Sequence, residues 1–128
     1  MASGERPLDA RGLPEGYPLQ EGWEITPRET QRLRDRGEPM LLLDVREAAE
    51  VAAAAIDGAV HVPMGEIKAR LTDLDEHAED PVVVFCHLGG RSMQVTAFLK
   101  QQGFDDVRSM AGGIDLWSRD VDPGIPRY

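Results

Sequence analysis

The sequence has 128 residues, a length that suits one compact domain and leaves little room for a second. Its net charge of −9 argues against a nucleic-acid binder, which needs clustered lysine and arginine, and against an electrostatic membrane anchor. No apolar stretch approaches the length of a membrane span, and the first residues carry no signal-peptide pattern. A single cysteine cannot form an internal disulfide. From these features we expect a cytoplasmic protein, in which the thiol stays reduced.

The first 22 residues are rich in proline, glycine and charge, and they predict an extended or flexible N-terminal arm. Residues 23–25 predict a short first strand, and residues 26–29 have the pattern of a capped helix start. The apolar runs 40–43 and 82–85 show no polar alternation. Such runs predict strands that are covered on both faces, as in a parallel sheet.

Helical patterns alternate with these runs along the chain. A further short strand is expected at 106–109, and residues 121–128 are expected to form a C-terminal tail beyond a single domain at 23–120. Because strand and helix alternate, the fold class is α/β with a mainly parallel sheet. Beyond the first helix, the predicted helices cover residues 47–54, 66–74, 91–102 and 114–117.

The segment 82–92 carries the strongest chemical signal: a strand, then Cys86, then a glycine loop and a helix. In open α/β sheets ligands bind beyond the carboxyl ends of the strands, which is where Cys86 stands. Gly89 and Gly90 allow the loop amides to curl around the sulfur, the positive end of the next helix points to the same place, and Arg91 adds a charge. These features favour the nucleophilic thiolate over the thiol. The alternative is a small buried cysteine that only packs.

Three residues near this loop have two interpretations each. Asp44 either accepts hydrogen bonds from the loop amides or Arg91, or caps the helix that starts three residues later. Arg46 either pairs with Glu50, four residues on, or faces an anionic substrate. His87 either assists proton transfer or lies exposed in the loop. We expect Asp44 and Arg46 to support the loop.

Four segments, in order and at suitable spacing, resemble motifs of the rhodanese-like domain family. The segment Cys86-His87-Leu88-Gly89-Gly90-Arg91 resembles its active-site loop, in which the cysteine carries a persulfide and the arginine closes the loop. The resemblance covers about residues 24–119 and implies a parallel five-stranded sheet with helices on both faces. The other three segments are 42–47, 56–63 and 112–117.

The resemblance implies a sulfurtransferase that moves sulfane sulfur from a donor such as thiosulfate to a small thiol, cyanide or a protein cysteine through a Cys86 persulfide. No metal or organic cofactor is expected, because three dispersed histidines and one cysteine give no metal-ligand spacing. One alternative is a sulfur-relay or interaction module for a partner protein, whose surface would be basic. Another is a phosphatase or arsenate reductase, which is less favoured because only four residues separate Cys86 from Arg91 and such enzymes have five.

Overall fold

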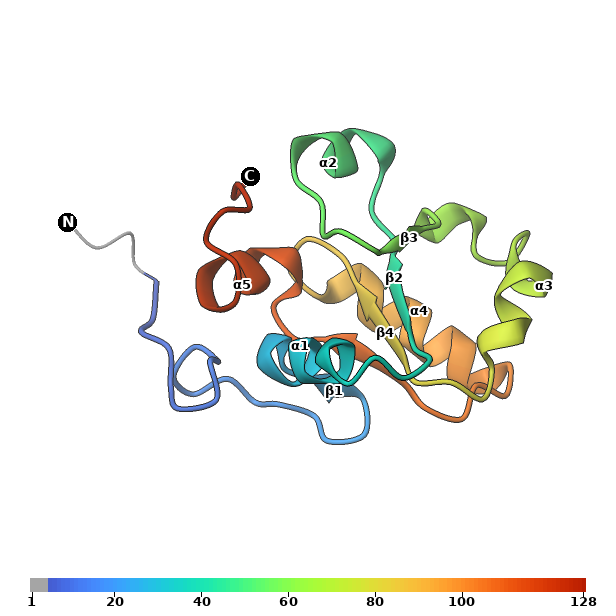
Figure 1. The fold of residues 1–128 in the computed structure, drawn as a ribbon, viewed down its shortest axis with the longest axis horizontal. Coiled ribbons are helices and arrows are strands. Elements are labelled where there is room, and N and C mark those ends of the chain that lie inside the picture. Colours follow the sequence, from blue (N-terminus) through green and yellow to red (C-terminus); the bar gives the residue numbers. More distant parts are fainter. Residues whose placement is uncertain (1–4) are drawn as a thin grey trace.

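Five short strands form one parallel sheet in the order β1-β5-β4-β2-β3 (Figure 1). The computed structural model describes residues 5–128 of the chain. The α/β class with a parallel five-stranded sheet is therefore confirmed. The strands are β1 (Glu24–Ile25), β2 (Leu41–Asp44), β3 (Val60–His61), β4 (Val82–Phe85) and β5 (Val107–Met110).

Helices cover both faces of the sheet (Figure 1). On one face α4 packs on β4 and β5 and shares a core with α3, and on the other face α1 and α5 pack together. Within residues 5–128, no helix is long and apolar enough to cross a membrane. The α-helices are α1 (Pro27–Asp35), α2 (Ala48–Ala53), α3 (Leu71–Leu74), α4 (Gly90–Gln101) and α5 (Gly113–Asp120), and the 3-10 turns are η1 (Met64–Glu66) and η2 (Asp75–His77).

Successive residues of the central strands β2 and β4 contribute to two different cores. Leu43 and Val84, which pair across the strands, pack in the cluster under α4, whereas Leu42 and Val83 pack in the cluster under α1 and α5. Every residue of both strands is buried. Burial of each such aliphatic side chain contributes about 1.5–3 kcal/mol, which explains the unbroken apolar runs 41–43 and 82–85. Asp44, which ends β2, is the buried charged exception.

The continuous helix expected over residues 66–74 does not form. The Ile67 amide donates to the Met64 carbonyl oxygen, three residues back, so this stretch begins as a 3-10 turn before the short helix α3. Ile67 and Leu74 both reach the core under α4 along this interrupted path. The apolar spacing of this stretch therefore predicts its buried side chains but not its helix type.

The N-terminal arm packs on α5 within the described part of the chain; its first four residues lie outside that part. Leu13 is buried against Ala111 and Leu116, and its amide donates to the Asp9 side chain. The Arg28 side chain donates to the Ala10 carbonyl oxygen and links the arm to α1. These contacts hold the arm along the domain.

The two central strands end side by side, and this places their following residues at one edge of the sheet. Asp44, the last residue of β2, is in register with Phe85, the last residue of β4. The Val45 amide donates to the Phe85 carbonyl oxygen at 3.1 Å and extends the pairing by one residue. Cys86 and the residues after Asp44 therefore lie at the carboxyl edge, where α/β sheets bind ligands.

Candidate active site

The sulfur of Cys86 lies inside a turn of backbone amides at the end of β4. Sγ accepts hydrogen bonds from the backbone N–H groups of Gly89 at 3.1 Å and Ser92 at 3.4 Å. Both groups lie at the start of α4, where the helix leaves its amides without partners and its dipole favours negative charge. Gly89 adopts a φ of 118° at the N-cap of α4, a backbone conformation that only glycine takes easily. A thiolate or a persulfide sulfur would therefore meet preorganised donors.

Ser92 lies beside the sulfur and was not identified from the sequence. Its side chain is buried, and its Oγ lies 3.4 Å from Cys86 Sγ, 2.7 Å from Ser109 Oγ and 3.2 Å from the Gly89 carbonyl oxygen. A hydroxyl can donate or accept, so Ser92 can bond to the sulfur as a thiol or as a thiolate. The available signal was a serine in the first turn of the helix that follows the cysteine loop.

The N-terminus of α5 holds the first two residues of the loop. The Ile114 amide donates to the Cys86 carbonyl oxygen at 2.9 Å, and the Asp115 amide donates to the His87 carbonyl oxygen at 3.2 Å. Gly113 makes this approach possible, because a Cβ there would overlap both carbonyl oxygens. Its positive φ of 59° also favours glycine. The Gly112-Gly113 pair therefore allows the N-terminus of α5 to donate hydrogen bonds to the cysteine loop that precedes α4.

Arg91, at the far end of the loop, forms a two-bond ion pair with Glu50 of α2. Its Nη1 donates to Oε1 at 2.6 Å and its Nη2 donates to Oε2 at 2.8 Å. These bonds from Arg91, aided by the hydroxyl of Tyr128, lower the pKa of Glu50 from 4.5 to about 2. The charge of Arg91 is therefore shared with a carboxylate at the rim of the loop.

Asp44 and Arg46 form a buried pair with each other. The Arg46 Nε and Nη2 donate to the Asp44 carboxylate at 2.9 and 2.7 Å, and Arg46 is fully buried. The expectation that Asp44 bonds to the loop amides or Arg91 is wrong, and so is the capping alternative, because Glu47 is the N-cap of α2. Arg46 reaches the Glu50 carbonyl oxygen, but its carboxylate partner is Asp44 rather than Glu50. Proximity in the folded chain outweighed the helical spacing.

Tyr128, from the expected tail, connects these groups and was also missed from the sequence. Its hydroxyl donates to Glu50 Oε2 at 2.8 Å and accepts from Arg46 Nη1 at 3.0 Å. Its ring stacks on His87, with 4.1 Å between the centroids and 13° between the planes. Burial raises the pKa of Tyr128, and the Glu50 carboxylate raises it further although Arg46 opposes this, so the hydroxyl keeps its proton.

The remaining loop residues differ in exposure. Leu88 is 63% exposed at the outside of the loop, and Gly90 is the first residue of α4. Within residues 5–128, no group of three histidine, cysteine, aspartate or glutamate side chains is arranged to hold a metal ion. The loop therefore offers amides, hydroxyls and one paired guanidinium around a single sulfur.

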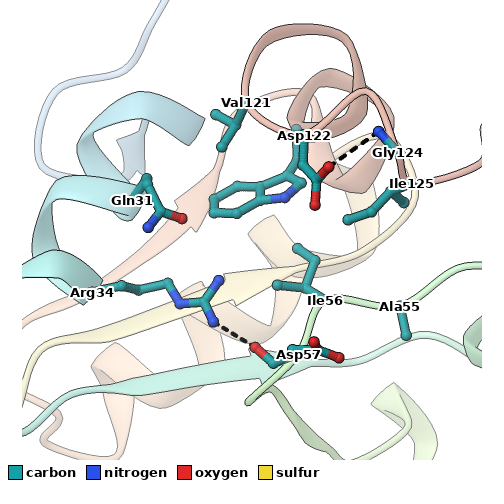
Figure 2. A pocket seen from close by; sticks show the side chains of 10 residues that line it. Gln31, Arg34, Ala55, Ile56, Asp57, Val121, Asp122, Gly124 and Ile125 are labelled. Atoms are coloured by element: carbon teal, nitrogen blue, oxygen red, sulfur yellow. Dashed lines mark hydrogen bonds between the residues drawn. The ribbon is translucent and has the colours of Figure 1, made fainter.

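A hollow of about 500 Å³ lies apart from the loop, between α1, residues 55–57 and the chain after α5 (Figure 2). Arg34 lines this hollow and donates to the Asp57 carbonyl oxygen. On the other wall the Gly124 amide donates to the Asp122 carboxylate at 3.1 Å. This second bond closes a turn that sends the chain back toward the loop.

The sequence of this chain is similar to those of known proteins, in agreement with the fold and the cysteine loop described above. The model of the rhodanese-like domain matches residues 26–120. The chain belongs to the rhodanese-like domain family. It is 38% identical over 99 residues to thiosulfate sulfurtransferase GlpE of Pseudomonas fluorescens (strain Pf0-1), covering 77% of this chain and 87% of that protein.

Two further similar proteins differ in how much of their own length this chain covers. The chain is 33% identical over 129 residues to adenylyltransferase and sulfurtransferase MOCS3-1 of Zea mays, covering 97% of this chain but only 28% of the length of the maize protein. The crystal structure of SSP1007 from Staphylococcus saprophyticus has a TM-score of 0.68 and 30% identity, over 81% of this chain and 98% of that one. The rhodanese match ends at residue 120, so Tyr128 lies beyond it.

Proposed function

We propose that this rhodanese domain is a sulfurtransferase that carries sulfane sulfur as a persulfide on Cys86. The observation that carries the proposal is the bonding of Sγ to the Gly89 and Ser92 amides at the positive end of α4. Donors at these positions stabilise negative charge on sulfur before and after sulfur is accepted. Arg91 completes the rim of the loop through its pair with Glu50.

The reaction has two displacements and no net redox change. The Cys86 thiolate attacks the outer sulfur of thiosulfate, a new S–S bond forms, and sulfite leaves with the electron pair of the broken bond. A thiophile such as cyanide or a thiolate then attacks the outer sulfur of the persulfide, and the Cys86 thiolate leaves. Neither displacement requires a metal or an organic cofactor. These 128 residues hold one cysteine, so none of them supplies a second thiol that could accept the sulfur.

The relatives support this chemistry. GlpE of Pseudomonas fluorescens, which this chain matches over most of its length, is named a thiosulfate sulfurtransferase. A single thiol that must be regenerated suits a reducing compartment, so we propose that the reaction takes place in the cytoplasm.

A second candidate function is delivery of sulfur to a partner protein. The maize relative, of which this chain spans little more than a quarter, is named both an adenylyltransferase and a sulfurtransferase. The net charge of −9 favours a basic patch on such a partner. In this case Cys86 would react in the same way, and only the acceptor would differ.

The decisive experiment is intact mass measurement after incubation with thiosulfate. We expect the protein to gain the mass of one sulfur atom, and cyanide or a reductant to remove it. Cys86→Ser is expected to abolish the gain, and Arg91→Ala to weaken transfer while the fold remains. Retention of thiosulfate sulfurtransferase activity in Cys86→Ser, or hydrolysis of aryl phosphates faster than sulfur uptake by the parent, would refute the proposal.

A further inference from the structure

Tyr128 contacts one end of the Cys86–Arg91 loop directly and is linked to the other end through Glu50. Its ring stacks on His87, the residue directly after the cysteine. Its hydroxyl donates to Glu50, whose carboxylate holds Arg91 at the other end of the loop. One side chain that lies outside the matched rhodanese segment therefore extends along the rim of the loop.

The buried guanidinium of Arg46 supports the Tyr128 side chain. Arg46 Nη1 donates to the Tyr128 hydroxyl oxygen at 3.0 Å, and the guanidinium carbon lies 5.8 Å from the centre of the ring. Arg46 is fully buried and paired with Asp44, so this support has little freedom to move. Stacking on one side and two hydrogen bonds at the hydroxyl fix the orientation of the ring.

The chain that carries Tyr128 is folded back onto α5. The turn closed by Asp122 and Gly124 begins this path (Figure 2), and Arg127 pairs with Asp115 in the first turn of α5. The Asp115 amide also bonds to the loop, so the loop and the chain end share one support. In Figure 1 the end of the chain lies between α5 and α2.

Access to the sulfur is narrow in this arrangement, because Cys86 is only 1% exposed. We propose that Tyr128 is a specificity-determining residue that limits Cys86 to small donors and acceptors. Larger reactants reach the sulfur only when the phenol leaves His87. For sulfur transfer, which rests on the function proposed above, the restricted access favours small reactants over bulky thiols. Such reactants are thiosulfate, cyanide, hydrosulfide and cysteines on extended peptide segments.

The first test measures access without sulfur transfer. Two neutral reagents with the same reactive group, N-methylmaleimide and N-(1-pyrenyl)maleimide, are compared by their rates of reaction with Cys86. In Tyr128→Ala the rate ratio of the bulky to the small reagent is expected to rise between about twofold and tenfold, the factor that loss of one aromatic stacking contact corresponds to. Tyr128→Phe keeps the ring and is expected to show a smaller rise.

Tyr17→Ala is the matched control, because the Tyr17 hydroxyl also donates to a glutamate, Glu24, but lies in the N-terminal arm. Its rate ratio is expected to equal that of the parent. The proposal is overturned if Tyr128→Ala leaves the ratio unchanged, or if Tyr17→Ala raises it equally, since that would indicate general loosening. Thermal melting of each variant establishes that it is folded.

The second test uses the persulfide formed with thiosulfate. Tyr128→Ala is expected to raise the rate of transfer to a bulky aryl thiol relative to cyanide. If the parent accepts no sulfur from thiosulfate, the proposed function fails, while the maleimide ratio still tests the role of Tyr128. If sulfur is accepted but neither ratio changes in Tyr128→Ala, the function stands and the role of Tyr128 is refuted.

Discussion

Glu50 and Arg91, which are 41 residues apart in the sequence, are joined by two hydrogen bonds of 2.6 and 2.8 Å. The pair connects α2 to the first turn of α4 and so ties the end of the cysteine loop to the opposite side of the rim. Two-bond pairs of arginine with carboxylate are stronger and more directional than single contacts. The position of Arg91 beside the loop therefore depends on Glu50.

Glu50→Gln is expected to lower the free energy of unfolding at neutral pH by about 1–2 kcal/mol, a range that allows for screening by solvent. The folded pKa of Glu50, about 2, lies below its ordinary value of 4.5. A carboxylate of this kind stabilises the fold above its ordinary pKa and loses that effect as the pH falls through the folded value. The difference between parent and variant in urea denaturation should therefore shrink as the pH falls from about 4.5 to 2.

The exposed Glu66 offers a control, since Glu66→Gln should change stability little at any pH. A difference between parent and Glu50→Gln that stays constant with pH would contradict the role of the Arg91 pair.

Asp44→Asn is expected to cost about 3–5 kcal/mol, because it leaves the fully buried guanidinium of Arg46 without a counter-charge. Urea denaturation measures this loss. Asp105→Asn, at an exposed position, should cost little. Arg46 also donates to the Tyr128 hydroxyl, so Cys86 in the Asp44→Asn variant should react faster with bulky maleimides. Equal stability of Asp44→Asn and Asp105→Asn would refute the role of Asp44 as counter-charge to Arg46.

Gly113→Ala should displace the loop, because its Cβ would overlap the carbonyl oxygens of Cys86 and His87. Strained backbone at one such residue costs about 1–3 kcal/mol, and the overlap adds to it. Thermal melting and the alkylation rate of Cys86 together report the change. Gly65→Ala is the control, since a Cβ at Gly65 meets no atom within 4 Å; a similar effect of both substitutions would contradict the close approach of α5.

Ser92→Ala removes the hydroxyl that lies 3.4 Å from Cys86 Sγ. We expect alkylation of Cys86 to slow by up to about tenfold, the factor that corresponds to the net contribution of one hydrogen bond, about 0.5–1.5 kcal/mol. Thr30→Ala removes another buried hydroxyl, one that bonds to the Thr26 carbonyl oxygen in α1. The Ser92 assignment is wrong if the two variants react with iodoacetamide at the same rate.

The central strands and the cysteine loop could be predicted because local sequence specifies them. The run 82–85 is a strand because each of its side chains is buried on one face or the other, and a sequence shows such burial directly as unbroken apolar character. Gly89 marks a backbone conformation that other residues adopt poorly, so the turn of amides after Cys86 was expected. The helix expected at 66–74 is limited to α3, because apolar spacing alone does not distinguish an α-helix from a path that begins with a 3-10 turn.

By itself, the sequence determined the α/β class, the strand that leads into Cys86, and the glycine loop that presents amides to its sulfur. Only the tertiary structure decided the partners of the charged groups: Asp44 with Arg46, and Glu50 with Arg91 and Tyr128. Strand, turn and helix propensities act over a few neighbouring residues. Ion pairs and stacking depend on distances in space, and folding brings together Tyr128 and Arg46, 82 residues apart, in a way that no local pattern encodes.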